Sequence, residues 1–239
     1  MASLSGKVAF VTGAGRGIGW AVAERFIREG ALVGAVARTE ADLLALQEAA
    51  RGAAGDCLPL QCDVADEAAV GRAAERAQRE LGDVEILVNN AGVFHEAPFC
   101  ETGAEVWQRL YEVNVLGAVH CLRALLPPML AAGRGRVVNV CSTAGHKPYP
   151  GQSAYCASKH ALLGLTRTLA AETSGTGVRV HAVSPGGVDT RLVRDSGRKV
   201  DLAEYMQPEE IADIVLFLAG MEGKAHIDDV LVRRIGASP

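Results

Sequence analysis

Short apolar runs alternate along the chain with longer segments in which apolar residues recur every three or four positions. The runs are rich in β-branched residues and apolar nearly throughout, which is typical of strands buried on both faces of a parallel sheet. Strands are predicted at residues 8–12, 32–37, 57–62, 86–89, 136–141, 178–183 and 229–233. Amphipathic helices are predicted at residues 19–29, 40–51, 67–81, 104–126, 154–173 and 209–218.

The regular order of strand and helix indicates the fold class. It implies right-handed β–α–β units and a parallel sheet that helices cover on both sides. No stretch rich in proline, serine or charge interrupts the pattern, and no repeat or low-complexity tract is visible. We therefore expect a doubly wound α/β fold in which a single domain takes up residues 1–239.

Composition and charge narrow the class of partner. The 239 residues are 49% hydrophobic and 22% charged, which is typical of a globular protein and argues against disorder. The formal net charge of −4 disfavours both a nucleic-acid footprint and attachment to an anionic membrane surface. No apolar run approaches the ~18 residues that a bilayer span needs, and residues 1–7 lack a signal-peptide layout. We expect a cytoplasmic protein with no nucleic-acid or membrane partner.

The cysteines and histidines give no sign of a metal site. The six cysteines are scattered through apolar stretches without a C-x-x-C pair, which favours buried, reduced thiols over disulfides. The six histidines form no H-E-x-x-H or H-x-H pattern. The sequence therefore predicts no bound metal.

A glycine-rich loop, Thr12-Gly13-Ala14-Gly15-Arg16-Gly17-Ile18-Gly19, joins the first predicted strand to the first helix. Glycines permit a tight turn and let a phosphate approach the backbone, and the helix that follows offers free N–H groups to an anion. In this strand–loop–helix context the loop predicts a dinucleotide-binding site. The strict G-x-G-x-x-G spacing is absent, and the spacing that stands is T-G-x-x-x-G-x-G.

That wider spacing resembles the short-chain dehydrogenase/reductase family, in its compact single-domain branch. Further family-like motifs follow in family order: Asp63-Val64, Asn90-Ala91-Gly92, Asn114, Ser142, Tyr155-x-x-x-Lys159 and Pro185-Gly186. The resemblance implies a Rossmann sheet of seven mostly parallel strands in the order 3-2-1-4-5-6-7, with helices on both faces.

The end of the second predicted strand bears on the choice of cofactor. Many dinucleotide folds place an acid there to hold the ribose 2′-hydroxyl of NAD, but position 37 is Ala37 and Arg38 follows. The forked guanidinium of Arg38 suits a 2′-phosphate, and Arg16 adds a second cation. Alternatively, Arg38 only caps its strand in solvent. The resemblance implies NADP(H).

The resemblance also implies which residues bind this cofactor: Gly13, Arg16, Gly17, Ile18, Gly19, Arg38, Asp63, Val64, Asn90, Ala91, Gly92, Tyr155, Lys159, Pro185, Gly186, Val188 and Thr190. Asp63 is implied to hold adenine, and Val188 and Thr190 to contact the carboxamide and the phosphates. A role for Asp63 as a helix N-cap is the alternative, although Asp66 is better placed for it. Structural bracing describes Asn90 equally well.

Three polar residues make a candidate catalytic group. Tyr155 and Lys159 are four positions apart and so share a helix face. A tyrosine is a poor acid or base at neutral pH, and a nearby ammonium is expected to lower its pKa. Ser142 ends the fifth strand, where open α/β sheets bind ligands, and its hydroxyl suits a carbonyl oxygen.

Asn114 lies in an apolar helical stripe, where a buried polar side chain must be satisfied. It either braces the backbone or, as the resemblance implies, holds a water that links the lysine to solvent. The catalytic set implied by the resemblance is thus Asn114, Ser142, Tyr155 and Lys159.

These residues predict an NADP(H)-dependent oxidoreductase that interconverts a small-molecule ketone or aldehyde and an alcohol, with Tyr155 as the acid or base. One alternative is a 3-oxoacyl-thioester reductase, whose acidic carrier protein would meet Arg134, Arg136 and Arg167, although a charged surface explains these three equally. A second alternative is a sensor or interaction protein that binds NADP without catalysis. The intact catalytic set favours an enzyme.

Departures from the family pattern concern the substrate and the assembly. The segment 191–207 is short and polar, which predicts a small or open substrate pocket. Its candidate lining is Val93, Phe94, His95, Ala144, His146, Tyr149, Gln152, Gly187 and Leu192. The C-terminus lacks the usual Gly-rich close, which weakens the expected C-terminal contact between subunits. Small and apolar residues on helices 104–126 and 154–173 still predict a homo-oligomer, at least a dimer with a tetramer favoured.

Overall fold

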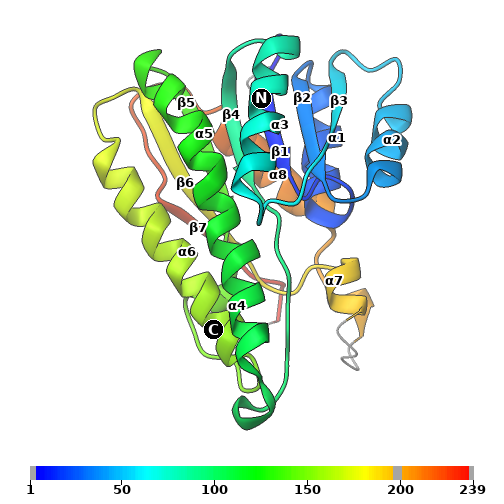
Figure 1. Ribbon diagram of the computed structural model, residues 1–239, viewed down its shortest axis with the longest axis vertical. Coiled ribbons are helices and arrows are strands. Elements are labelled where there is room, and N and C mark those ends of the chain that lie inside the picture. Colours follow the sequence, from blue (N-terminus) through cyan, green and yellow to red (C-terminus); the bar gives the residue numbers. More distant parts are fainter. Residues whose placement is uncertain (1–3, 196–200, 237–239) are drawn as a thin grey trace.

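The seven strands form one sheet in the computed structural model, which describes residues 4–195 and 201–236 (Figure 1). The strand order is β3-β2-β1-β4-β5-β6-β7 and every neighbouring pair is parallel, so the predicted order is confirmed. The strands are β1 (Val8–Thr12), β2 (Leu32–Ala37), β3 (Asp56–Gln61), β4 (Val84–Asn89), β5 (Gly135–Val140), β6 (Val178–Pro185) and β7 (Asp229–Val232).

The central strands are buried on both faces, as their apolar runs predict. In β1 the side chains of Ala9 and Val11 join one core cluster, and those of Val8 and Phe10 join the other. Successive side chains of a strand point to opposite faces, so an uninterrupted apolar run supplies both cores at once.

Helices cover both faces of the sheet (Figure 1). The cluster on one face includes α1 and α8, and the cluster on the other includes α3, α5 and α6. The helices are α1 (Gly17–Arg28), α2 (Glu40–Ala49), α3 (Glu67–Leu81), α4 (Ala104–Tyr111), α5 (Gly117–Ala131), α6 (Ser153–Glu172), α7 (Arg191–Arg194) and α8 (Pro208–Ala219).

The predicted helix 104–126 has a different form in the structure. It comprises α4, a π-helical segment (Glu112–Leu116) and α5, and it continues to Ala131. By length and composition alone, the stretch 104–131 is apolar enough to cross a membrane. Its side chains Leu125 and Met129 are buried in the core beneath the sheet, as in the core helix of a globular protein.

Candidate active site

A cavity of about 640 Å³ opens at the carboxyl ends of the strands, where the loops after β1, β2, β4, β5 and β6 meet. In a doubly wound sheet this is the edge at which ligands bind. All but two of the predicted site residues line it: Gly13, Arg16, Gly17, Ile18, Arg38, Asp63, Val64, Asn90, Ala91, Gly92, Ser142, Tyr155, Lys159, Pro185, Gly186, Val188 and Thr190. The two exceptions are Gly19 and Asn114, which lie behind its wall.

The backbone of the glycine loop adopts a conformation that residues with a side chain at the glycine positions would strain. Gly13 and Gly17 have φ values of +68° and +57°, in the left-handed region that favours glycine. A Cβ on Gly19 would lie 2.3 Å from the carbonyl oxygen of Gly13, so Gly19 serves the packing of α1 against the loop. The first turn of α1 holds no acid and its N-cap, Arg16, makes no side-chain cap. Its free N–H groups therefore fit the phosphates of a dinucleotide.

Thr12 connects the glycine loop to the end of β4. Its Oγ1 accepts hydrogen bonds from the backbone N–H groups of Asn90 (3.0 Å) and Ala91 (3.1 Å). The side-chain Nδ2 of Asn90 donates to the Thr12 carbonyl at 2.9 Å. Asn90 thus braces the two central strands while it lines the cavity. The sequence motif contained Thr12, but its role as a donor–acceptor link emerges only from the fold.

Arg38 and Arg16 are exposed and line the same end of the cavity. Asp42, on α2, lines it as well, and a Cβ on Gly15 would lie 3.3 Å from its carboxylate Oδ2. The acid that is missing at position 37 is therefore supplied nearby from a helix. Sequence reasoning missed Asp42 because nothing in the chain marks it as a neighbour of the glycine loop.

Asp63 follows β3, lines the cavity and is held by two donors. Its Oδ1 accepts from the Ala65 N–H at 3.0 Å and its Oδ2 from Arg109 at 3.2 Å. Burial raises the pKa of this carboxyl, but the hydrogen bonds from Ala65 and Arg109 and the arginine charges outweigh burial and leave the pKa below its usual value. Asp66 is the N-cap of α3, so Asp63 does not serve that role.

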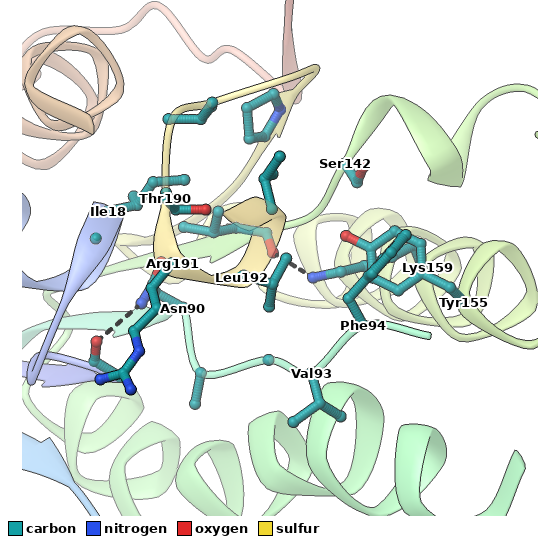
Figure 2. A pocket seen from close by; sticks show the side chains of 18 of the residues that line it. Ile18, Asn90, Val93, Phe94, Ser142, Tyr155, Lys159, Thr190, Arg191 and Leu192 are labelled. Carbon is teal, nitrogen blue, oxygen red and sulfur yellow. Dashed lines mark hydrogen bonds between the residues drawn. The ribbon is translucent and has the colours of Figure 1, made fainter. Parts of the chain in front are cut away.

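Ser142, Tyr155 and Lys159 lie together on one side of the cavity, across from Ile18 and Asn90 (Figure 2). Ser142 lies near Tyr155, whose pKa its hydroxyl lowers, and its Oγ accepts from the Ala144 N–H at 3.1 Å. The strand end of β5 therefore brings Ser142 to two residues of α6, as the sequence predicts.

Burial controls the ionisation of this group. It raises the pKa of Tyr155 to about 12, against a lowering by the hydrogen bond from Ser142, and it lowers the pKa of Lys159. The Lys159 Nζ lies 5.9 Å from the centroid of the Tyr155 ring and donates to the Val140 carbonyl at 3.0 Å. The expected lowering of the Tyr155 pKa by Lys159 is not met in this arrangement, because burial dominates and the ammonium is directed to a carbonyl.

Asn114 sits in the π-helical segment, and protein partners take both of its amide hydrogens and one acceptor site of its oxygen. Its Oδ1 accepts from the Val93 N–H at 2.8 Å, and its Nδ2 donates to the Val93 carbonyl and to Ser158 Oγ at 3.0 and 3.1 Å. A Cβ on Gly92 would lie 3.3 Å from Asn114 Oδ1 and 3.8 Å from Lys159 Nζ. Asn114 thus braces the loop after β4 directly behind Lys159, and its role in a proton relay stays a prediction.

Of the residues predicted to line the substrate pocket, all but two histidines line the cavity. Val93, Phe94, Ala144, Tyr149, Gln152, Gly187 and Leu192 line the cavity, whereas His95 and His146 are absent from its wall. His146 is directed away because its Nε2 lies 3.1 Å from Ser184 Oγ on β6 and 3.0 Å from Asp229 Oδ2 on β7. The Phe94 ring packs edge-on against Tyr155, with centroids 4.9 Å apart.

Part of the polar segment 191–207 lines the cavity. Residues 191–194 form the short helix α7, whose Arg191 and Leu192 line the cavity (Figure 2). Arg194 pairs with Asp189 at 2.8 Å. Residues 196–200 of the predicted segment lie outside the described residues.

The three arginines considered for an acidic carrier protein already have partners. Arg134 lies 3.6 Å from Glu85, and Arg167 lies 3.5 Å from Asp229. Arg136 is partly buried and donates to the Met221 carbonyl at 2.9 Å. These contacts favour the interpretation of the three as ordinary surface and edge residues.

The chain is similar in sequence to known proteins along most of its length. A family model described as short chain dehydrogenase matches residues 7–201. A 3-oxoacyl-(acyl-carrier-protein) reductase of Thermotoga maritima is 34% identical, over 92% of each chain.

Two solved structures with a bound nicotinamide cofactor share the fold over nearly the whole chain. A metagenomic short-chain oxidoreductase in complex with NADP has a TM-score of 0.85 and 36% identity, and covers 97% of this chain and 98% of its own. A 3-oxoacyl-(acyl-carrier-protein) reductase from Brucella melitensis with bound NAD has a TM-score of 0.86 and 32% identity, and covers 97% and 90%.

Proposed function

The chain belongs to the short-chain dehydrogenase/reductase family of nicotinamide-dependent oxidoreductases, and on that premise we propose that it interconverts a ketone or aldehyde and the matching alcohol with NADP(H). One observation carries the proposal: Ser142, Tyr155 and Lys159 meet in the cavity that the glycine loop also lines. Neither a structural brace nor a simple ligand pocket requires this combination of groups.

The chemistry divides between the cofactor and the chain. A bound nicotinamide supplies or accepts the hydride. The hydroxyls of Ser142 and Tyr155 lie near each other in the cavity wall, where each is placed to donate its hydrogen to one carbonyl oxygen bound between them. Tyr155 is protonated below its pKa of about 12, so in the reductive direction it enters as the acid. Phe94 packs on the Tyr155 ring and excludes water from that side.

The arrangement of charge supports NADP(H) over NAD(H). Arg38 and Arg16 line the end of the cavity where the adenosine 2′-position belongs, and arginine suits a phosphate through paired hydrogen bonds. Asp42 opposes this preference, since an acid near that position favours a free 2′-hydroxyl. Two exposed cations outweigh one carboxylate in our proposal.

All six cysteines are free thiols, which supports a reducing, cytoplasmic location.

The contacts to the rest of the cofactor are part of the same proposal. We assign adenine to Asp63 and Val64, the phosphates to the glycine loop, and the nicotinamide end to the residues after β6. Those residues are Gly186, Val188 and Thr190, and Pro185 at the end of β6 belongs with them; all four line the cavity beside the catalytic group. A 3-oxoacyl thioester is the second candidate substrate, because a relative at 34% identity is named as such a reductase.

A panel of ketones, aldehydes and a 3-oxoacyl thioester tests the proposal through NADPH absorbance. We expect wild-type turnover of at least one carbonyl compound, faster with NADPH than with NADH. Tyr155→Phe removes only a hydroxyl, so it is expected to lose about a hundredfold or more in turnover while it still binds NADPH. A wild-type protein that binds NADPH but reduces no member of the panel would instead be an NADP-binding sensor.

A further inference from the structure

The substrate end of the cavity carries basic side chains that the proposed reaction does not use. Lys147, Arg233 and Arg234 line it together with the rings of Tyr149 and Tyr205. Acidic side chains of the described lining are confined to the other end, where Asp42 and Asp63 lie near the glycine loop and the end of β3.

Arg233 is placed close to the catalytic serine by the register of the last strand. It follows β7 directly, and the Val232 carbonyl before it accepts the Gly186 N–H at 2.8 Å. A Cβ on Gly186 would lie 3.6 Å from Thr143 Cγ2 and 4.0 Å from the Arg233 Cα. Arg233 and Thr143, the residue that follows Ser142, therefore both border Gly186.

The neighbouring groups leave the Arg233 guanidinium available. Within the described residues Arg233 makes no hydrogen bond or ion pair, and its side chain is exposed. Arg234, in contrast, pairs with Glu204 at 2.9 Å and lies 5.3 Å above the Tyr205 ring. Arg234 is thus held in the wall, while Arg233 keeps its donors for a ligand.

Lys147 adds positive charge on the same side of the cavity. Its Nζ lies 5.5 Å above the Tyr149 ring, and the Tyr149 hydroxyl hydrogen-bonds Thr143 Oγ1 at 2.9 Å. Tyr149 therefore links Lys147 to the turn that carries Ser142 and Thr143.

On the premise of the proposed function, we propose that the substrate is an oxo acid or the matching hydroxy acid, whose carboxylate Arg233 binds while Ser142 and Tyr155 hold the reacting oxygen. A guanidinium binds a carboxylate through two parallel hydrogen bonds, which fixes orientation as well as distance. The positive charge of Arg233, unpaired within the described residues, also raises the local concentration of an anionic substrate. Arg16 and Arg38 lie at the opposite end, so the cofactor phosphates do not account for Arg233.

Matched substrate pairs test the inference. Each oxo acid, across a series of distances between the oxo carbon and the carboxylate, is compared with its own primary amide. We expect wild-type kcat/KM to favour the best acid over its amide by at least about tenfold, and this preference to fall with added salt.

Variants of Arg233 test whether this residue causes the preference for the acid over the amide. Arg233→Gln is expected to remove most of the preference through a rise in KM for the acid, with the amide unaffected. Arg233→Lys keeps the positive charge but loses the forked guanidinium, so it is expected to retain part of the preference for the acid over the amide. Arg51→Gln is the matched control, since Arg51 is an exposed arginine outside the cavity that pairs with Glu48. Calorimetric binding of the acid to Tyr155→Phe, with and without Arg233→Gln, gives a readout free of turnover.

The outcomes separate the inference from the proposed function. Equal kcat/KM for acid and amide throughout the series, or an Arg233→Gln variant that keeps the preference, overturns the inference and leaves the carbonyl reductase in place. Turnover of no acid, amide or simple ketone overturns both. If Arg233→Gln fails to fold, the salt dependence of the wild-type acid-to-amide ratio and the Arg233→Lys variant decide.

Discussion

At the scale of single residues, Tyr155 and Lys159 show how burial changes the pKa of an ionisable side chain. Lys159 is buried and Tyr155 is half-buried in the cavity wall, and burial disfavours both the tyrosinate and the ammonium. The spacing of four positions in the sequence predicts that they share a face, which the structure bears out. It does not predict where the ammonium points, because that depends on the Val140 carbonyl from another element.

The first prediction concerns this ionisation. With a pKa of about 12, Tyr155 remains protonated in the free protein throughout the neutral range and loses its proton only as the pH rises towards 12. The ultraviolet difference spectrum between wild type and Tyr155→Phe is therefore expected to show no tyrosinate below about pH 10. Lys159→Met is expected to show no tyrosinate in this range either, because removal of a nearby cation can only raise the pKa of the Tyr155 phenol. Tyrosinate absorbance that appears near pH 7 and vanishes in Tyr155→Phe would contradict the assignment.

The second prediction concerns His146, which anchors the far end of the turn that begins at Ser142. Ser184 Oγ donates its hydrogen to Asp229 Oδ1 at 2.8 Å, so it accepts from the His146 Nε2–H at 3.1 Å, and Asp229 Oδ2 lies 3.0 Å from the same nitrogen. His146→Leu removes this anchor and is expected to lower kcat by about ten- to a hundredfold, through misplacement of Ser142. Affinity for NADPH is expected to stay near that of wild type.

The control for His146 is a conservative change. The amide nitrogen of glutamine replaces an imidazole Nε2–H donor, so His146→Gln is expected to recover most of the lost kcat. A purely structural role would lower the melting temperature of His146→Leu without moving kcat for the molecules that remain folded. Equal kcat in wild type and His146→Leu would contradict the positioning role.

At the scale of elements, the apolar strands were predictable from the sequence because burial on both faces leaves little room for another interpretation. The π-helical segment was not. It contains Asn114, whose hydrogen-bond partners Val93 and Ser158 lie in a loop and a helix that are distant in the sequence. Asp42 and Arg109 were missed for the same reason, since their places in the cavity follow from the packing of α2 and α4.

The third prediction compares two helical glycines. A Cβ on Gly19 of α1 would meet the Gly13 carbonyl oxygen at 2.3 Å, whereas a Cβ on Gly71 of α3 would meet nothing within 4 Å. Gly19→Ala is expected to cost about 2 kcal/mol or more of unfolding free energy and to weaken NADPH binding, because the phosphate loop must move. Gly71→Ala is expected to stabilise the protein by about 0.5–1 kcal/mol. Urea unfolding measures both, and a neutral Gly19→Ala would contradict the packing argument.

At the scale of the whole molecule, a single doubly wound domain over residues 1–239 and a homo-oligomeric state both stay predictions. Helices α5 and α6 lie on one face of the sheet (Figure 1). Leu165 on α6, which the sequence marks as an interface candidate, packs against its own core clusters and so is a poor probe. Gly164 beside it is exposed with open space around its Cα, and Leu116 is 45% exposed.

The last prediction places the contact between subunits on these outward positions. Small residues let helices from two copies approach closely around a two-fold axis, and exposed apolar side chains such as Leu116 supply the buried area. Light scattering is expected to give at least twice the 25.0 kDa mass of one chain. Gly164→Arg puts a long cation into that contact and is expected to yield monomers. Gly71→Arg, at an equally open helical glycine on α3, is the matched control and is expected to leave the assembly intact. A monomeric wild type at micromolar concentration, or an assembly that tolerates Gly164→Arg, would rule out packing through this face, because an arginine there has no room between two closely packed helices.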